Sequence, residues 1–107
     1  MIDKCNMDEK KFSKYFKAFG DPSRLKIISI LAAKEMTVNE IVDQMNLSQP
    51  TISRHLAILR EAEVVIDRRE GQNVYYSLNK NSVQTCCTGF CDCLAIPVPR
   101  TKKMKKK

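Results

Sequence analysis

The first third of the chain places hydrophobic and polar residues at the spacing of amphipathic helices. Between Asp8 and Gly20, aromatic residues stand at positions i, i+3, i+4 and i+7, with lysine and serine mostly between them. These aromatic residues are Phe12, Tyr15, Phe16 and Phe19. Such a stripe usually packs into a core or a subunit interface, and a ligand-binding box is the less common alternative. Gly20 predicts the end of this helix.

Asp21 and Pro22 predict the start of a second helix, because Asp caps helix N-termini and Pro fits the first helical position. We expect this helix to be the most buried of the domain, since apolar residues cover a wide part of its surface. Its main predicted stripe is Leu25, Ile28, Leu31 and Ala32, widened by Ile27 and Ile30.

Residues 37–40 have the pattern of a capping box, in which the Thr37 hydroxyl and the Glu40 carboxylate satisfy each other's backbone N–H groups. The short helix that they start should end near Asn46. Its apolar face is Val38, Ile41, Val42 and Met45.

Ser48 predicts the cap of the next helix, and Pro50 falls in its first turn, where a missing N–H is harmless. Its apolar stripe at i, i+4 and i+7 is Ile52, Leu56 and Leu59. Two short helices joined by so brief a turn predict a helix-turn-helix, in which the second helix reads DNA.

The start of this second helix carries polar side chains on the face away from its apolar stripe. They are Gln49, Thr51, Ser53 and Arg54. Gln, Arg and Ser/Thr side chains hydrogen-bond base edges in the major groove, and a helix N-terminus favours phosphate. An ordinary solvated helix face is the alternative interpretation of this stretch alone.

After Glu63 the hydrophobic pattern alternates, which predicts strands over 64–69 and 73–78 joined by a tight turn at 70–72 that contains Gly71. A hairpin after a helix-turn-helix predicts a winged helix, so the fold class is mainly α with a β-hairpin wing, in the order of four helices, two strands and a last helix. Arg68 and Arg69 lie beside the turn, where they suit a phosphate backbone or a minor groove. The alternative for both is a charged edge strand that resists aggregation.

Charge adds little to this picture. The 107 residues carry a net charge of +7, but six of the 19 basic residues follow residue 99. Residues 1–99 hold 13 basic and 12 acidic residues, so the basic excess is no evidence that the folded body binds DNA.

We expect one domain over residues 1–96 and a disordered basic tail over 97–107. With no membrane-spanning run and no secretory signal pattern, the protein is expected to be cytosolic and not bound to a membrane.

A last helix is expected to begin after Asn79, capped by Asn81 or Ser82 and weakened by Gly89. It contains four cysteines within eight residues: Cys86, Cys87, Cys91 and Cys93. Clustered thiols favour a soft ion, whereas packing as small hydrophobic residues would need a local core. On a regular helix Cys86 and Cys87 point about 100° apart, so three thiolates converge only if the helix unwinds near Gly89. An enzyme is not expected, because the chain has one histidine and no nucleophile–base set.

The chain resembles the ArsR/SmtB family of metal-responsive repressors from about Phe12 to Leu78. The segments that carry the resemblance are D-P-S-R-L-K-I-I from Asp21, S-Q-P-T-I-S-R-H-L-A-I-L-R-E-A-E-V-V from Ser48, and R-R-E-G-Q-N-V-Y-Y-S-L from Arg68. The resemblance implies a homodimer, joined through its first and last helices, that binds a palindromic double-stranded operator and leaves it when metal binds.

The resemblance assigns DNA-facing positions to part of the reader helix and to the wing. On the reader helix they are Ser48, Gln49, Thr51, Ser53, Arg54 and His55, and on the wing Arg68, Arg69 and Gln72. His55 flanks the apolar stripe by angle, so a half-buried imidazole or a phosphate contact is favoured there over metal binding.

The family's metal sites differ in position. A cysteine pair before the reader helix is absent from residues 37–42, and a histidine-containing site on the last helix is excluded because His55 is the only histidine. The spacing C-C-x-x-x-x-x-C looks like the C-terminal arsenite site of some members, which implies Cys86, Cys87 and Cys93 as ligands and As(III) as inducer. Sb(III) is a close analogue, and a tetrahedral four-sulfur site that adds Cys91 would suit Cd(II) or Pb(II).

Other interpretations of the cysteines stay open. Thiol oxidation, for example to a Cys87–Cys91 disulfide, would make the protein a redox-sensing repressor. A small metal-buffering protein would bind metal without sequence-specific affinity for DNA, which the reader helix argues against. Cys5 is an idle thiol or a residue that approaches the cluster across the dimer.

Overall fold

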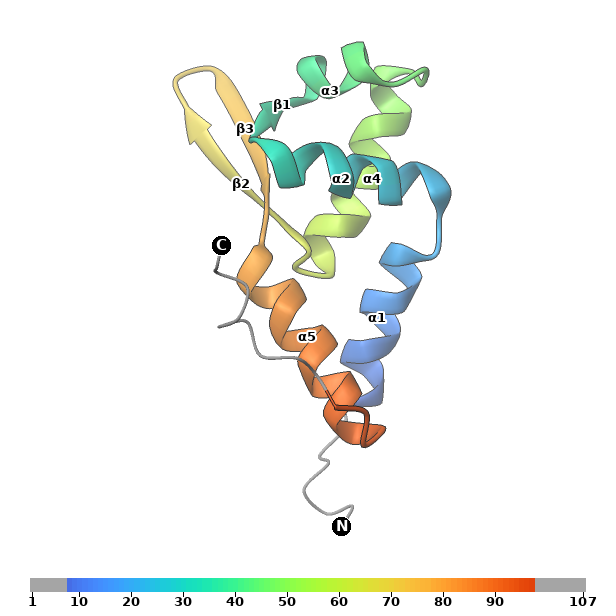
Figure 1. Ribbon diagram of the computed structural model, residues 1–107. Helices are drawn as coiled ribbons and strands as arrows, with labels where there is room; N and C mark the ends of the chain where they lie inside the picture. Colours follow the sequence, from blue (N-terminus) through green and yellow to red (C-terminus); the bar gives the residue numbers. More distant parts are fainter. Residues whose placement is uncertain (1–7, 98–107) are drawn as a thin grey trace.

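The structure is a computed structural model that describes residues 8–97, and its helices and strands form a winged helix-turn-helix (Figure 1). The expected fold class is therefore confirmed. The predictions for Cys5 and for the tail after Pro97 fall outside the described residues. In chain order the elements are α1 (Glu9–Phe19), α2 (Pro22–Ala33), β1 (Met36–Thr37), α3 (Val38–Gln44), α4 (Gln49–Glu61), β2 (Val65–Glu70), β3 (Asn73–Leu78) and α5 (Lys80–Cys93).

The helices α1 and α5 lie side by side at one end of the molecule, and α2, α3 and α4 form the other end, from which the hairpin projects (Figure 1). Where α1 meets α5, the Phe90 ring packs edge-on against Phe12 and Phe16, with centroids 5.6 and 4.8 Å apart. The Tyr15 hydroxyl also hydrogen-bonds the Ser82 side chain. The reader helix and the cysteine-bearing helix therefore belong to different ends of one domain, and α1 contacts both ends.

The predicted hairpin is present, with one strand added to it. β2 and β3 pair antiparallel from Val65↔Leu78 to Glu70↔Asn73, and Gly71 takes a positive φ of 64° in the turn. The short strand β1 pairs with the other edge of β3, Met36 opposite Tyr76, to give the strand order β1-β3-β2. A two-residue strand has no periodicity to detect, so the sequence did not predict it.

The capping residues fix where the helices begin. The Asp21 carboxylate accepts from the N–H groups of Ser23 and Arg24, and the capping box of Thr37 and Glu40 is complete. The cap of α5 differs from the expectation, because Asn79 accepts from the Ser82 N–H and neither Asn81 nor Ser82 is the cap.

The stripe predicted for α4 is buried as expected, with Ile52, Leu56 and Leu59 at no more than 1% exposure. The stripe predicted for α2 is partly wrong. Leu25 is 50% exposed and Ala32 is exposed, whereas Ile27 and Leu31 lie in the core. Apolar residues surround α2 almost completely, so periodicity could not choose its buried face, and its packing against α4 and β3 made that choice.

Among the described residues, no helix combines the length and the hydropathy needed to cross a lipid bilayer.

The two faces of α2 give a test of this packing. Ile27→Ala should lower the free energy of unfolding by about 2–5 kcal/mol, because it opens a cavity among fully buried side chains. Leu25→Ala is the matched control, two residues away on the exposed side of α2. It should lower the free energy of unfolding by no more than about 1 kcal/mol. Urea unfolding followed by circular dichroism measures both, and a larger loss for Leu25→Ala would contradict the orientation of α2.

Candidate nucleic-acid interface and thiol cluster

The N-terminal turn of α4 is ordered by its own side chains. The Ser48 Oγ accepts from the Thr51 N–H at 3.4 Å and donates to the Thr51 Oγ1 at 3.0 Å. Both hydroxyls remain exposed enough to meet a ligand, but each already takes part in capping. They define the shape of the helix tip.

The next polar residues of α4 lie on its outer surface. Gln49 and Arg54 are exposed, and Ser53 is half-buried, while the stripe of Ile52 and its partners faces the core. The Gln49 amide and the Arg54 guanidinium are thus open to solvent near the start of a helix whose opposite stripe is buried. This arrangement supplies the donors and acceptors that read base edges.

His55 points away from this surface and into the contact between α2 and α4. Its side chain is 15% exposed, with Nε2 4.0 Å from the Asp21 carboxylate and Nδ1 3.3 Å from the Arg24 guanidinium. Arg24 also donates to the carbonyl oxygens of Ala18 at 3.0 Å and Lys17 at 3.1 Å, at the C-terminal end of α1. His55 therefore joins three helices in this structure, as the half-buried imidazole that its angle suggested.

The sequence interpretation assigned no role to Arg24. The signal that it did contain was position, because Arg24 falls in the first turn of α2, directly after the Asp21 cap. A long guanidinium at that point can reach backward to the preceding helix end, where unpaired carbonyls accept from it.

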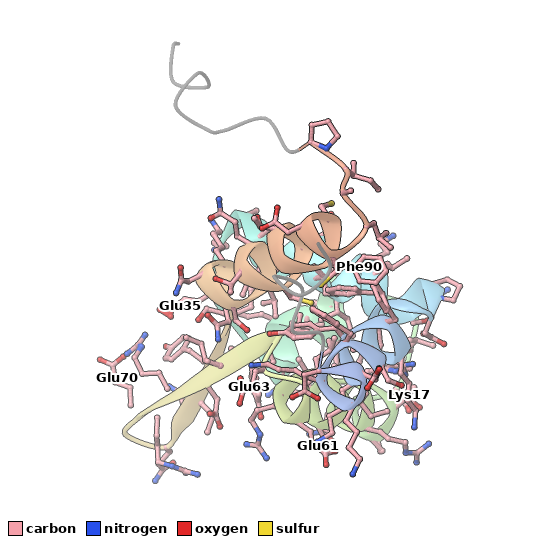
Figure 2. All side chains as sticks on the ribbon, turned by 90° about the horizontal axis from the view of Figure 1, so that it is seen from below. Lys17, Glu35, Glu61, Glu63, Glu70 and Phe90 are labelled. Carbon is pink, nitrogen blue, oxygen red and sulfur yellow. The ribbon has the colours of Figure 1, made fainter. Side chains whose placement is uncertain are left out.

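The two wing arginines have different surroundings. Arg68 donates to Glu35 at 2.6 Å and to Glu70 at 2.7 Å, and its guanidinium lies 4.9 Å from the Tyr75 ring centroid. These hydrogen bonds, first to Glu35 and then to Glu70, raise the pKa of Arg68. Figure 2 shows both glutamates on the hairpin side of the molecule.

Arg69 and Gln72 are exposed near the tip of the hairpin. Of the wing residues assigned to DNA, they are the more available, because Arg68 already interacts with two carboxylates and a ring.

The helix α5 runs without a break from Lys80 to Cys93, so the unwinding near Gly89 that would bring three thiolates together is not present. Within residues 8–97, no three Cys, His, Asp or Glu side chains are placed to hold a metal ion. Cys86 and Cys93 stand two turns apart, about 10 Å along the axis.

Cys86 is 6% exposed and faces α1. Burial raises the pKa of the Cys86 thiol, and the neighbouring Cys87 adds to this effect, while Lys11 opposes it. Cys87 is an exposed free thiol and Cys91 a half-buried one. Cys93 is half-buried at the end of α5 and is disulfide-bonded in this structure, so it would supply a thiolate only after reduction.

Large apolar side chains are exposed near the contact between α1 and α5. Phe16 is 46% exposed beside Phe90, and Leu94 and Ile96 beyond the helix are 49% and 48% exposed. Figure 2 shows Phe90 against α1.

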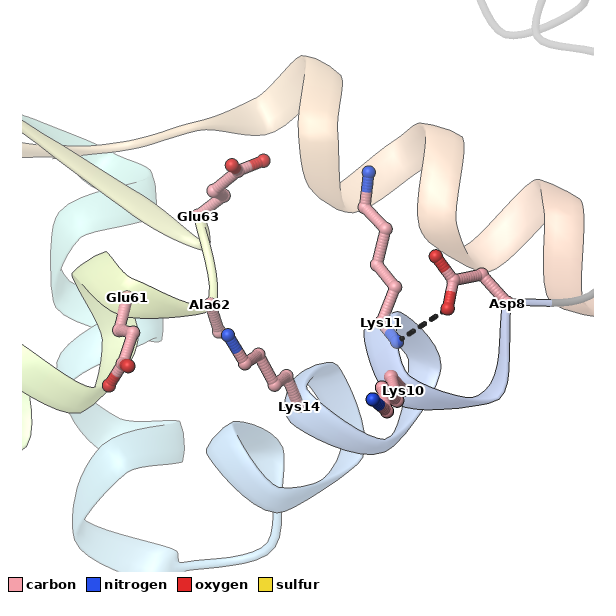
Figure 3. Close-up of a pocket in the computed structure, with 7 residues that line it drawn as sticks. All are labelled: Asp8, Lys10, Lys11, Lys14, Glu61, Ala62 and Glu63. Carbon is pink, nitrogen blue, oxygen red and sulfur yellow. Dashed lines mark hydrogen bonds between the residues drawn. The ribbon is translucent and has the colours of Figure 1, made fainter.

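A pocket of about 340 Å³ opens between α1 and the end of α4 (Figure 3). Lys10, Lys11 and Lys14 line it from α1, and Glu61 and Glu63 face them from the C-terminal end of α4. The Glu63 backbone has a positive φ of 66° at this corner. Charges of both signs meet here, so the pocket has no preference for one class of ion.

The chain is similar in sequence to a family of bacterial regulators and to several of its members. Residues 21–67 match the sequence model of the family described as "Bacterial regulatory protein, arsR family". The chain is 49% identical over 69 residues to the transcriptional repressor SdpR of Bacillus subtilis, an overlap of 64% of this chain and 77% of that repressor.

Two further similarities involve a curated relative and a solved structure. Identity reaches 48% over 65 residues with the arsenic resistance transcriptional regulator ArsR1 of Pseudomonas putida, which covers 60% of this chain and 51% of that protein. The chain thus spans about half the length of that regulator. HlyU from Vibrio cholerae superimposes with a TM-score of 0.67 at 31% identity, over 81% of this chain and 95% of HlyU.

The burial of the thiols gives a test of the α5 arrangement. At neutral pH Cys87 should react with iodoacetamide about tenfold or more faster than Cys86, because Cys86 is shielded and its raised pKa keeps it protonated. The Cys86 rate should continue to rise at alkaline pH as its thiolate forms. Peptide mass spectrometry of Cys86→Ser and Cys87→Ser resolves the two rates, and equal rates would contradict the burial of Cys86.

Proposed function

Since the chain belongs to the ArsR/SmtB family of transcriptional repressors, we propose that it binds operator DNA as a homodimer and is released when trivalent arsenic binds cysteines of α5. The observation that carries the proposal is the pairing, in one domain, of an anchored reader helix with a thiol-rich last helix. Residues 1–96 form the DNA-binding and dimerisation domain of this proposal. The relatives are DNA-binding regulators and not enzymes.

Contact with DNA is assigned to the tip of α4 and to the wing. Gln49, Ser53 and Arg54 would read base edges in the major groove, and Arg69 and Gln72 would contact the backbone or the minor groove beside it. Ser48 and Thr51 would present the helix N-terminus to a phosphate. His55 and Arg68 remain assigned to the interface, but their role would be to hold α4 and the wing in place.

The homodimer is assigned to the surface that α1 and α5 share. Phe16, which packs against the Phe90 ring, is half exposed there, and Leu94 at the end of α5 is also half exposed. Apolar side chains exposed together at the edge of a domain are stabilised by burial in a second copy. The two reader helices of such a dimer would reach successive turns of a palindromic operator.

Induction is assigned to Cys86, Cys87 and Cys93, supported by the arsenic named in the description of the P. putida relative. Trivalent arsenic prefers three sulfurs. On the unbroken helix α5, Cys93 lies two turns from Cys86 along the same side, and Cys87 lies about 100° around the axis from Cys86. Binding all three would therefore require α5 to unwind. Sb(III) has the same preference, while Cd(II) or Pb(II) would need a fourth thiolate, for which Cys91 is available.

Unwinding of α5 has a physical route to α4. Ser82 of α5 hydrogen-bonds Tyr15 of α1, and the last carbonyls of α1 bind Arg24, which contacts His55 of α4. A shift of α1 against α2 would change the support behind the reader helix. Ligand binding that favours the shifted arrangement then weakens DNA binding by the same free energy.

The wing gives a matched pair of variants for DNA binding. Arg69→Ala should weaken operator affinity and lower the slope of log K against log salt by about 1, because one phosphate contact is lost. Arg68→Ala should leave that slope nearly unchanged, since its charge is already paired with two carboxylates. Fluorescence anisotropy at several salt concentrations measures both, and a greater change in slope for Arg68→Ala would contradict the assignment.

Arsenite titration of the repressor–operator complex tests induction. The wild-type protein should leave the DNA, and the triple variant Cys86→Ser, Cys87→Ser, Cys93→Ser should stay bound at concentrations on the order of 100-fold higher, because no three-thiol set remains. X-ray absorption should find three sulfurs around arsenic in the wild type. Release of the triple variant at the wild-type concentration would falsify the site, and four sulfurs with cadmium would favour the tetrahedral alternative.

A further inference from the structure

We propose that Arg24 and His55 are positioning residues for DNA binding, and that they hold the reader helix α4 in its binding orientation only while the His55 imidazole is neutral. The effect on DNA rests on the proposed function, whereas the junction of the two side chains rests on distances in this structure. His55 is the only histidine of the chain, so its charge can be followed and changed by itself.

Arg24 lies at the centre of this junction. Its Nε donates to the Ala18 carbonyl at 3.0 Å and its Nη2 donates to the Lys17 carbonyl at 3.1 Å. Both carbonyls belong to the C-terminal turn of α1, where carbonyls lack the usual i+4 donor. The remaining nitrogen, Nη1, contacts His55. One guanidinium therefore joins α1, α2 and α4.

The contact between Arg24 Nη1 and His55 Nδ1, at 3.3 Å, determines where the ring carries its proton. Arginine has N–H donors and no acceptor, so Nδ1 must accept, and it accepts only when it carries no proton. The proton of the neutral ring is then on Nε2, which faces the Asp21 carboxylate at 4.0 Å. One tautomer of the neutral imidazole therefore suits both neighbours.

The charged groups that face the imidazole are one cation and one anion, both from α2. Arg24 is at Nδ1, and the Asp21 Oδ2 at Nε2 also caps α2 by accepting from the N–H groups of Ser23 and Arg24. The elements α3 and β2 pack against α4 too, but within residues 8–97 they make no hydrogen bond or ion pair with the His55 side chain. Because the ring is half-buried, water screens these charges only partly.

Protonation of the ring reverses its contact with Arg24. A proton on Nδ1 would set an imidazolium N–H against the guanidinium, so an attraction would become a repulsion between two cations. Arg24 keeps its two carbonyl acceptors on α1, whereas the His55 side chain makes no other hydrogen bond within the described residues. The Asp21 carboxylate attracts the charged ring. The histidine, and with it this part of α4, is therefore the partner that moves.

A movement of His55 reaches the DNA-reading surface directly, because Ser53 and Arg54 precede it on α4. If the DNA-bound arrangement holds the neutral ring, operator affinity falls as the pH is lowered, by at most about tenfold per pH unit for a single proton. A histidine that contacted a phosphate would give the opposite sign, because its positive charge would strengthen binding. The sign of the pH dependence therefore separates a junction within the protein from a contact with DNA.

Fluorescence anisotropy of the full-length protein with operator DNA tests the sign, at constant salt between about pH 5.5 and 7.5, where imidazole titrates. The wild-type protein should bind on the order of tenfold more weakly at the lower pH. His55→Asn places a neutral acceptor near the Nδ1 position, so it should bind about as tightly as the wild type at the higher pH and respond little to pH. A wild-type affinity that rises or stays constant toward low pH, or an unchanged profile in His55→Asn, would overturn the proposal.

A pair of arginine variants tests the other half of the junction. Arg24→Lys keeps the charge but loses the fork that serves three acceptors, so operator binding at the higher pH should weaken on the order of tenfold. Arg60→Lys is the matched control, because Arg60 is also close to α4 DNA-reading residues in sequence but pairs with the exposed Asp67 at 2.9 Å, outside the junction. It should keep the wild-type affinity and pH profile. Equal losses in the two variants would contradict the role of Arg24.

Nuclear magnetic resonance of the free protein tests the junction without DNA and separates this inference from the proposed function. The ¹⁵N spectrum of the single imidazole should show a neutral ring protonated on Nε2 at about pH 7.5, and a mixture of tautomers in Arg24→Lys. If arsenite releases the wild-type protein from its operator but the ring is protonated on Nδ1, the junction is wrong and the proposed function stands. If the ring is protonated on Nε2 but no operator is bound at any pH, the contact stands, and both the proposed function and the role in DNA binding are wrong.

Discussion

The burial of one side of α4 is the constraint on which the rest of the molecule depends. Ile52, Leu56 and Leu59 are almost completely removed from solvent, so turning this side outward would expose three large apolar side chains. Because this side cannot rotate outward without exposing them, the polar side keeps a fixed direction. A helix that reads a groove needs such a fixed direction, since small rotations would misplace hydrogen bonds to base edges.

Helix α1 contacts both ends of the domain. One side of α1 meets α5 through Tyr15 and the phenylalanine rings, and its C-terminal carbonyls bind Arg24 from α2. Arg24 in turn contacts His55 of the reader helix. A chain of contacts through α1 and Arg24 therefore connects the last helix with the reader helix.

Electrostatics in this protein depend on position more than on net charge. The described body is nearly neutral, and Arg68, one of the two basic residues at the wing, is occupied by Glu35 and Glu70. The Glu35 carboxylate links the hairpin to the segment after α2, whereas Glu70 pairs with Arg68 within the hairpin. Arg54 on α4 and Arg69 on the wing are exposed, and the proposed contact with DNA assigns phosphate and base contacts to them.

The sequence by itself determined the order of the helices and of the two hairpin strands, most helix starts and the place of the helix-turn-helix, because caps, turn glycine and periodic stripes are local signals. Ser48, the Thr37–Glu40 box and the hairpin around Gly71 are examples. Tertiary structure alone decided which side of α2 is buried, since its apolar residues lie all around the helix. It also decided that Met36 and Thr37 join the sheet, and that His55 and Arg68 interact within the protein. It also decided how α5 divides its cysteines, since an unbroken helix sends Cys86 toward α1 and leaves Cys87 and Cys91 on the flank. Such outcomes depend on partners distant in the chain, and no local pattern contains them.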